Sequence, residues 1–361
     1  MTTAALHEQG VRIGPDDRLR RLMRLHFDPD LGTPFWLDRA RALGLDPRRD
    51  VRTAADLALF GDMKPADLSG RPLADFIPRR FHADLAGYVL GQTGGTTGGG
   101  VWTAYRADEF EAAFITPFEL AAAHVGFPRG EPWLFVGPSG PHIIGKVLRS
   151  LAARLGSHDP FSVDFDARWA KKLPDGSFAL DRYLAHVVEQ SLAVLTTQEI
   201  GVLFTTPAVL GALADAMTPA QRGRIRGIHY GGMELPAAAL ERFQRDVFPD
   251  AVHLSGYGNT LFGCCLELDT RPGRTPVYFP YGERLLMEVA DPSGRPASPG
   301  AEGTVRFTRL DETSLIIRML ERDAGAAETP PPNAPPGFAG SGIRGPHSPP
   351  SLAPRQAKGL Y

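Results

Sequence analysis

The residues best suited to chemistry are the ten from Gly91 to Gly100, which include six glycines and three threonines. Glycine tolerates positive φ and lets the main chain approach a ligand closely, so successive amide groups in such a loop can form a concave site for an anion. The hydroxyls of Thr93, Thr96 and Thr97 add hydrogen-bond donors. The loop therefore predicts polyphosphate binding, although the same composition also fits a flexible loop without function.

The loop does not match the two best-known phosphate-binding motifs. A Walker loop needs Lys and then Ser or Thr after its last conserved glycine, and Gly99 and Gly100 stand there instead. A dinucleotide fingerprint needs G-x-G-x-x-G between a strand and a helix. Serine hydrolase and zinc chemistry are disfavoured as well, because the chain has no G-x-S-x-G elbow and no zinc-site spacing of His and Cys.

The loop resembles the phosphate loop of the adenylate-forming superfamily, which includes acyl-CoA synthetases, adenylation domains and luciferases. The usual form there is Ser/Thr-Ser/Gly-Gly-Thr-Thr-Gly-Lys-Pro. Gly99 takes the place of the lysine and Gly100 that of the proline, so a charge that helps to hold pyrophosphate is missing. The resemblance implies a catalytic role for Thr97. It implies phosphate binding by Thr93, Gly94, Gly95, Thr96, Thr97 and Gly98.

Two later segments resemble the adenine-binding parts of that superfamily. Gly231-Gly232-Met233-Glu234 is similar to its Gly-Gly/Ala-Glu turn, although an ordinary strand-to-helix loop reads the same way. The run Tyr257-Gly258-Asn259-Thr260 resembles Tyr-Gly-x-Thr-Glu, which implies that the tyrosine packs on adenine and the threonine reaches the α-phosphate in catalysis. Leu261 replaces the family's glutamate, a magnesium ligand, and leucine offers no oxygen to Mg²⁺.

A fourth segment, Leu315–Asp323, resembles the L-I-R-Y-x-x-G-D segment of the phenylacetate-CoA ligase-like branch. The match implies that Asp323 binds the ribose hydroxyls, because one carboxylate can accept from both. Earlier in the chain, His142 lies in a turn similar to the one that borders the carboxylate pocket, which implies a catalytic contact; a capping or packing histidine is the alternative. The pair Cys264-Cys265 is consistent with an acyl-thioester carrier or, more simply, with inert core residues.

Positioning these residues requires a sheet with helices around it. Alternating apolar runs and helical patterns favour an α/β fold with parallel layers, whose ligands bind at the carboxyl ends of the strands. The glycine turns at 231–232 and 256–258 follow the third and fourth strands, so we expect them on one rim. The expected strands are 133–137, 202–205, 226–230 and 252–255, and the expected helices are 108–126, 145–156, one opening at 207, and 236–246.

Composition shifts suggest three segments. Residues 1–276 are expected to form the large adenylation core with a helical region over 16–45, and 277–323 a small antiparallel β subdomain that ends at Asp323. Residues 324–361 are rich in Pro and Gly and are expected to be an extended or disordered tail. The resemblance then implies that the superfamily's C-terminal domain is absent, as in short phenazine-biosynthesis adenylating enzymes.

Bulk properties narrow the class of protein. A formal net charge of −2 over 361 residues gives no electrostatic argument for nucleic acid or membrane surfaces as partners. No apolar run approaches the roughly 20 residues that span a bilayer, and no secretory signal is visible at the N-terminus. We therefore expect a cytoplasmic protein.

Taken together, the resemblance implies ATP-dependent activation of a carboxylic acid to an acyl-adenylate, with ATP and Mg²⁺ as cofactors. The acid is expected to be aromatic and to belong to specialised metabolism, such as phenazine-type antibiotic biosynthesis, with the acyl group passed to a partner acceptor or reductase. Two alternatives stay open. One is an accessory protein that binds a nucleotide or an acid with weak or no catalysis, and the other is an acyl-protein synthetase of the luminescence type.

Overall fold

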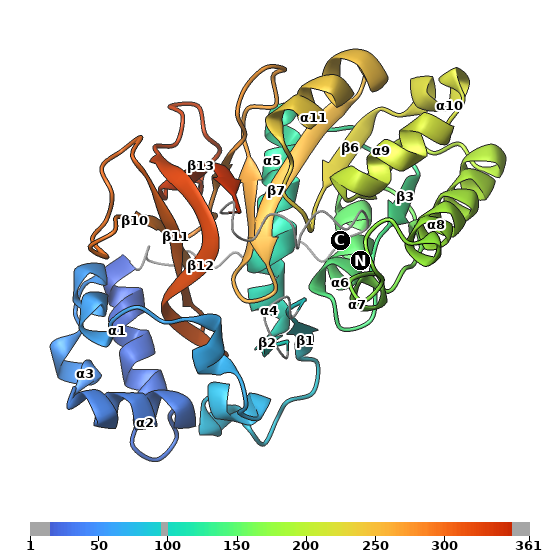
Figure 1. Cartoon of the computed structure of the whole chain (residues 1–361). Helices are drawn as coiled ribbons and strands as arrows, with labels where there is room; N and C mark the ends of the chain where they lie inside the picture. The colour runs from blue at the N-terminus through green and yellow to red at the C-terminus, as the bar shows by residue number, and fades with distance from the viewer. Residues whose placement is uncertain (1–14, 95–99, 349–361) are drawn as a thin grey trace, which may run out of the picture.

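The fold is built on a large mixed sheet whose parallel half carries the expected strands. The computed structural model describes residues 15–94 and 100–348 (Figure 1). The parallel strands are β3 (Trp133–Val136), β4 (Phe161–Val163), β5 (Val202–Thr205), β6 (Gly227–Tyr230) and β7 (Val252–Asn259). They pair in the order β4-β3-β5-β6-β7. Every residue of β3, β5 and β6 is buried, as expected for parallel strands covered on both faces.

The other half of the sheet is antiparallel and continues directly from β7. Its strands are β8 (Gly263–Glu267), β9 (Val277–Phe279), β10 (Leu285–Ala290), β11 (Glu302–Leu310), β12 (Leu315–Glu328) and β13 (Gly342–His347). The full order within the described residues is β10-β11-β12-β13-β9-β8-β7-β6-β5-β3-β4. The antiparallel strands expected over 277–323 are present, but they extend the large sheet instead of forming a separate small subdomain.

Two boundaries expected from the sequence differ in the structure. The glycines at 256–258, expected in a turn, lie within β7, because β8 passes so close that a Cβ at Gly258 would lie 2.3 Å from the carbonyl oxygen of Gly263. The expected tail from residue 324 is also wrong for its described part: β12 continues to Glu328, and β13 pairs with both β12 and β9. Ile343 of β13 is fully buried, which explains why this Gly-rich segment is held in the sheet.

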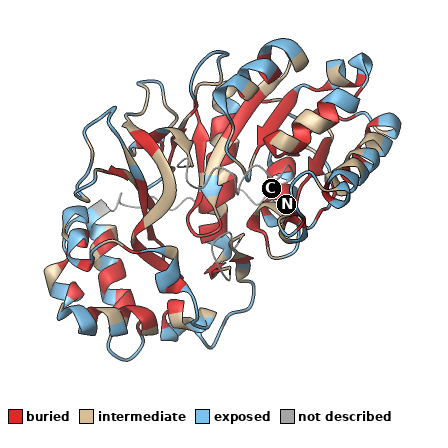
Figure 2. Ribbon diagram, viewed as in Figure 1, coloured by how far each residue is buried: buried red, intermediate tan, exposed pale blue. Residues whose placement is uncertain are grey.

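Helices cover both faces of the parallel strands, and the buried residues concentrate between these layers (Figure 2). They are α5 (Thr116–Val125), α6 (Ile143–Arg154), α8 (Phe178–Thr197), α9 (Pro207–Ala216) and α11 (Ala237–Arg242). Successive strand residues point to opposite faces. Trp133 and Phe135 accordingly pack in one core with α5 and α6, whereas Leu134 and Val136 pack in another with α8, α9 and α11.

The N-terminal helices pack on the antiparallel half of the sheet and not on the parallel half. They are α1 (Pro15–His26), α2 (Pro34–Leu43) and α3 (Pro47–Asp50), and they lie beside β10, β11 and β12 in Figure 1. The indole N–H of Trp36 donates to the carbonyl of Leu315 at 2.8 Å, and the two regions share one hydrophobic core. The expected boundary at residue 276 therefore does not separate this core, because the core includes residues from both sides of it.

Short elements complete the chain. They are the hairpin strands β1 (Val89–Gln92) and β2 (Trp102–Tyr105), the helices α4 (Ala107–Phe110), α7 (Ala167–Ala170) and α10 (Pro219–Arg224), the 3₁₀ turns at 54–60, 65–68, 73–76 and 79–81, and the π-helical turns at 111–115 and 243–247. Among the described residues, every helix is too short or too polar to cross a bilayer.

Candidate functional site

The Gly-rich loop connects the two strands of the β1–β2 hairpin, and its base is closed by hydrogen bonds. The Thr93 amide donates to the carbonyl of Val101, and the Val101 amide donates to the Thr93 hydroxyl, both at 2.9 Å. The side-chain amide of Gln92 donates to the carbonyl of Gly100 at 3.2 Å. Thr93 thus has a structural role in holding the loop closed. The predicted phosphate-binding residues Gly95, Thr96, Thr97 and Gly98 lie outside the described residues.

A buried arginine fixes this hairpin to the large sheet. Arg309 of β11 donates to the Thr103 hydroxyl at 2.9 Å and to the Ala104 carbonyl at 2.8 Å, both in β2. Asp311 pairs with both Arg309 and Arg284 at 2.6 Å, and all three side chains are buried. Burial alone would raise the pKa of Asp311, but the two guanidinium groups hold it below its usual range. The loop therefore starts from a rigid support.

The structure places Thr260 directly beside the hairpin. A Cβ at Gly91 would lie 2.6 Å from Cγ2 of Thr260 and 3.1 Å from Cδ1 of Ile143, so β1 touches both the end of β7 and the start of α6. Thr260 is buried, and its carbonyl accepts a hydrogen bond from the Tyr105 hydroxyl at 2.8 Å. Glycine at 91 is therefore required for close contact and not for flexibility.

The turn of residues 231–234 follows β6 on the same edge of the sheet. A Cβ at Gly231 would lie 2.9 Å from Cδ1 of Ile144 and 3.2 Å from Cε2 of Phe204, which places the turn against the first turn of α6. Gly232 has φ of +81°, a conformation that favours glycine. Met233 is half-buried in this turn. The predicted adenine-binding turn and the predicted carboxylate-binding turn are thus neighbours.

Tyr257 and Asp323 meet although their strands are not adjacent in the sheet. Three strands lie between β7 and β12. On a flat sheet, β7 and β12 would therefore be about 19 Å apart. The Tyr257 hydroxyl nevertheless donates to Oδ2 of Asp323 at 3.1 Å. Burial raises the pKa of Tyr257 well above its usual range, so the hydroxyl stays a donor. The sheet therefore curves strongly and brings two predicted site residues together across its concave side.

The second oxygen of Asp323 also accepts a hydrogen bond from within the chain. The Ser348 hydroxyl donates to Oδ1 of Asp323 at 3.2 Å, and the Ser348 amide donates to a carboxylate oxygen of Glu234 at 3.2 Å. The residue after β13 therefore bridges the predicted ribose-binding carboxylate and the turn after β6. Sequence reasoning missed this contact, because it assigned residues beyond Asp323 to a tail.

Asn259, predicted to contact nucleotide, has a structural role. Its side-chain oxygen accepts from the amides of Leu261 at 2.7 Å and Phe262 at 3.2 Å, which forms the turn between β7 and β8. Its side-chain amide donates to the carboxylate of Glu321. Burial, with the charge of Asp323, raises the pKa of Glu321 to about 7. Glu321 is therefore a titratable member of the site that sequence reasoning did not identify.

His142 precedes the first residue of α6 and is 6% exposed. Burial, reinforced by the charges of Arg168 and Lys171, lowers its pKa. A neutral imidazole at this position can donate one hydrogen bond to a carboxylate or phosphate oxygen without carrying a charge. The side chain forms no hydrogen bond that caps α6, so the placement agrees with a substrate contact or with the packing role left open from the sequence.

Two basic residues, Arg168 in α7 and Lys171 directly after it, approach the start of the loop and were not predicted. Arg168 donates to the side-chain oxygen of Gln92 at 2.6 Å. A Cβ at Gly94 would lie 3.5 Å from Nζ of Lys171. Gln92 and Gly94 flank the start of the loop, so two cations lie at its entrance. No short motif reveals this contact, because Arg168 lies 76 positions after Gln92 in the sequence.

The residues at the expected metal position do not fit a magnesium ion. Leu261 is 3% exposed and packs in the hydrophobic core shared with the N-terminal helices. Residues 15–94 and 100–348 contain no group of three or more His, Cys, Asp or Glu side chains arranged to hold a metal.

The two cysteines are poorly suited to carry an acyl group. Cys264 and Cys265 lie in β8, and Cys265 is fully buried. Burial raises the pKa of Cys264 to about 12 and raises that of Cys265 as well. Because the thiolate is the nucleophile and burial keeps these thiols protonated, the environment disfavours the acyl-protein synthetase alternative.

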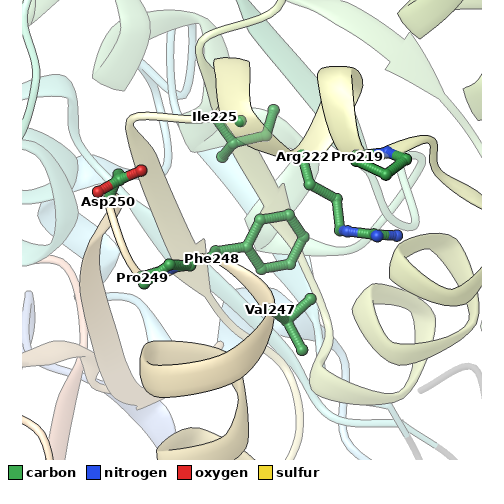
Figure 3. Close-up of a pocket in the computed structure, with 8 residues that line it drawn as sticks. Pro219, Arg222, Ile225, Val247, Phe248, Pro249 and Asp250 are labelled. Atoms are coloured by element: carbon green, nitrogen blue, oxygen red, sulfur yellow. The ribbon is translucent and has the colours of Figure 1, made fainter.

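A cavity of about 180 Å³ lies elsewhere, at the amino ends of β6 and β7 (Figure 3). It is lined by Pro219, Arg222, Gly223, Ile225, Val247, Phe248, Pro249 and Asp250. Ligands of parallel α/β sheets bind at the opposite, carboxyl edge. The candidate site is therefore the region between the hairpin, the turns after β6 and β7, and the inner face of β12, and not this cavity.

Comparison with solved structures identifies the same fold in acyl-CoA ligases. One structure of 2-hydroxyisobutyryl-CoA ligase, with 2-HIB-AMP and CoA in the thioesterification state, matches with a TM-score of 0.63 and 18% identity over 92% of this chain. An open conformation of that ligase, also with 2-HIB-AMP and CoA, matches with a TM-score of 0.62 and 16% identity over 91% of this chain. The chain covers 66% of the first of these structures and 72% of the second.

Sequence comparison adds nothing to this likeness. No family model matches the sequence, and no curated protein matches it. At this level of identity the structural match concerns the fold alone, and it confirms the mixed α/β architecture. The relation to the phenylacetate-CoA ligase-like branch and to phenazine enzymes stays a prediction from the motifs.

Proposed function

We propose that this chain binds ATP at the candidate site and activates a carboxylic acid as an acyl-adenylate. The observation that carries the proposal is the convergence of four motif segments far apart in the sequence. The hairpin contacts Thr260, and the turn at Gly231 contacts α6. The Tyr257 hydroxyl donates a hydrogen bond to Asp323. Chance motif matches would not be expected to meet at the carboxyl edge of one sheet.

The roles follow from the chemistry that each position offers. Tyr257 and the turn after β6 would hold adenine, Asp323 the ribose, and Thr260 the α-phosphate. The acid's carboxylate would then attack the α-phosphorus, with a new P–O bond forming as pyrophosphate leaves. His142, which lies beside the loop, would orient the carboxylate. Catalysis would depend on positioning and on stabilisation of charge in the transition state.

The finer parts of the proposal rest on the sequence resemblance. They are an aromatic acid, a place in specialised metabolism, and transfer of the acyl group to a protein acceptor or reductase. Mg²⁺ would accompany ATP, and no step is assigned to it, because the residues at its expected position do not fit. A nucleotide-binding accessory protein is the second candidate, favoured by the two hydrogen bonds that Asp323 already accepts within the chain.

Exchange of radioactive pyrophosphate into ATP tests the proposal. The purified chain is assayed with a panel of aryl, hydroxy and fatty acids, beside Asp323→Asn and an exposed control, Asp246→Asn. Exchange that requires one acid, persists in the control and is lost in Asp323→Asn supports acyl-adenylate formation. ATP binding without exchange for any acid favours the accessory role instead.

A further inference from the structure

Two hydrogen bonds cross the concave side of the sheet and join β7 to β12. The Tyr257 hydroxyl donates to Asp323, and the side-chain amide of Asn259 donates to the carboxylate of Glu321. The later residue of β7 meets the earlier residue of β12, so the two strands pass each other in opposite directions at this point. The two strands therefore contact each other at two neighbouring positions, although they are not paired in the sheet.

An irregularity in β12 coincides with these contacts. The register of the β11–β12 pair shifts between Thr304 and Arg306, where three residues of β12, 321–323, lie opposite one residue of β11. Extra residues of this kind bend a strand and re-aim its side chains, often beside active sites. The contacts of Glu321 and Asp323 with β7 are thus a local feature of β12 and not a property of a regular strand.

The order of the two contacts agrees with how the proposed function places a nucleotide. Tyr257 would hold adenine and Asp323 the ribose, so the first contact belongs to the nucleoside. Thr260, proposed to reach the α-phosphate, directly follows Asn259 in the sequence. The contact between Asn259 and Glu321 therefore belongs to the phosphate end of the nucleotide.

The side chain of Asn259 connects Glu321 to the main chain around Thr260. Its oxygen accepts from the amides of Leu261 at 2.7 Å and Phe262 at 3.2 Å, so it closes the turn that contains Thr260. Its amide nitrogen donates to Glu321 at the same time. Because donor and acceptor share one planar group, holding the amide nitrogen also holds the oxygen in place. Glu321 therefore fixes the side chain that shapes this turn.

Thr260 is also held on its other sides. Its carbonyl accepts from the Tyr105 hydroxyl at 2.8 Å, and its Cγ2 lies 2.6 Å from where a Cβ of Gly91 would stand. The methyl and hydroxyl groups branch from the same tetrahedral Cβ, so a methyl group held against Gly91 directs the hydroxyl away from it. The position of the hydroxyl thus depends on the main chain of the turn, which Asn259 and Glu321 hold.

Glu321 lies where its charged form is destabilised. It is half-buried, and burial together with the charge of Asp323 raises its pKa to about 7, while the charge of Arg322 opposes this rise. On the side of β7, the Tyr257 hydroxyl and the Asn259 amide face the same carboxylates. Carboxyl groups perturbed in this way concentrate at functional sites. The hydrogen bond with Asn259 provides a reason for keeping this one.

We propose that Glu321 is a positioning residue, which acts through Asn259 to hold the Thr260 hydroxyl in place for the α-phosphate. This inference rests on the proposed function and adds a residue to it. Glu321 would not touch the nucleotide, and what it supplies is an acceptor for the Asn259 amide. Glutamine has the same length and keeps a carbonyl acceptor, whereas methionine offers only a weakly accepting sulfur.

Calorimetry on the full chain tests the inference, with AMP and adenosine as separate ligands, because only AMP has the phosphate. The measurements are made at pH 6, where Glu321 is mainly protonated and glutamine matches its charge. Glu321→Met should weaken AMP binding about tenfold and leave adenosine binding unchanged. Glu321→Gln should bind AMP as the wild type does, and so should the exposed control Glu199→Met.

A double variant tests whether the effect passes through Asn259. Glu321→Met combined with Asn259→Ala should lose no more AMP affinity than Asn259→Ala alone, because both changes remove the same contact. Losses that add in the double variant would contradict this route. They would indicate instead that Glu321 acts on the nucleotide directly.

The remaining outcomes separate the inference from the proposed function. Equal loss of AMP and adenosine affinity in Glu321→Met would mean that Glu321 only supports the fold, and thermal unfolding would show that damage independently. A loss in Glu321→Gln as large as in Glu321→Met would refute the role of the hydrogen bond. Unchanged AMP affinity in Glu321→Met would refute the positioning role and leave the proposed function intact. A wild-type chain that binds neither ligand would refute both.

Discussion

Replacing Glu267 by glutamine should change how stability depends on pH. Glu267 of β8 is 3% exposed and pairs with Tyr278 of β9 in the sheet. The Ser255 hydroxyl donates to its carboxylate at 2.5 Å and lies 3.1 Å from the Tyr278 hydroxyl. Burial raises the pKa of Glu267 from 4.5 to about 8. Glutamine has nearly the same shape and reproduces the neutral, protonated form.

The direction in which stability changes with pH follows from comparing proton binding by Glu267 in the folded and unfolded chains. Below pH 4.5 both hold the proton, so this group's contribution to stability is fully present. Between pH 4.5 and 8 the unfolded chain loses the proton while the folded chain keeps it, so the free energy of unfolding falls as pH rises. At about 1.4 kcal/mol per pH unit, this carboxyl accounts for a loss of about 3–5 kcal/mol by pH 9.

Urea unfolding at pH 4, 7 and 9, followed by tryptophan fluorescence, measures this effect. Wild type and Glu267→Gln should have similar stability at pH 4, and the variant should be more stable by about 3–5 kcal/mol at pH 9. Glu283→Gln, at an exposed position, is the matched control and should follow wild type at every pH. A constant difference between Glu267→Gln and wild type from pH 4 to pH 9 would show that this reasoning is wrong.

Three further changes have defined outcomes. Asp311→Asn leaves two buried arginines without their carboxylate and should lower the free energy of unfolding by about 3–5 kcal/mol, measured in urea. Ser348→Ala removes a hydrogen bond to Asp323 worth about 1 kcal/mol and should tighten AMP binding about fivefold in calorimetry; weaker binding would contradict competition with the ribose. Gly91→Ala places a methyl group against Thr260 and should reduce pyrophosphate exchange at least about tenfold, because the loop must move; unchanged exchange would contradict the close contact.

The sequence predicted secondary structure best for strands that are buried on both faces of the sheet. The strands at 133–136 and 202–205 were predicted correctly, because an apolar run covered on both faces leaves a clear pattern. Glycine was a weaker guide. At 256–258 it indicates a tight approach between β7 and β8, and at 324–348 the Pro and Gly content concealed a strand anchored by Ile343. Composition alone does not distinguish a turn from a close strand contact.

For the site, the order of the motifs indicated the candidate segments. Which side chains of these segments contact one another follows only from the fold. Tyr257 contacts Asp323 and Thr260 contacts the β1 strand at Gly91, while the roles that the resemblance implies for them stay predictions. The positions of Arg168 and Lys171 beside the loop could not be predicted, because nothing in the sequence relates Arg168 to Gln92, 76 positions earlier. The contact of Ser348 with Asp323 likewise depends on β13 returning to the sheet.

Direct detection of an acyl-adenylate tests the central claim most directly. The chain is incubated with ATP and each acid of the panel, quenched, and analysed by mass spectrometry for the acid joined to AMP. We predict one acyl-AMP product in amounts comparable to the enzyme, formed by wild type and absent from Asp323→Asn. Tight ATP binding with no acyl-AMP from any acid would contradict the proposed activity and leave a nucleotide-binding protein without ligase chemistry.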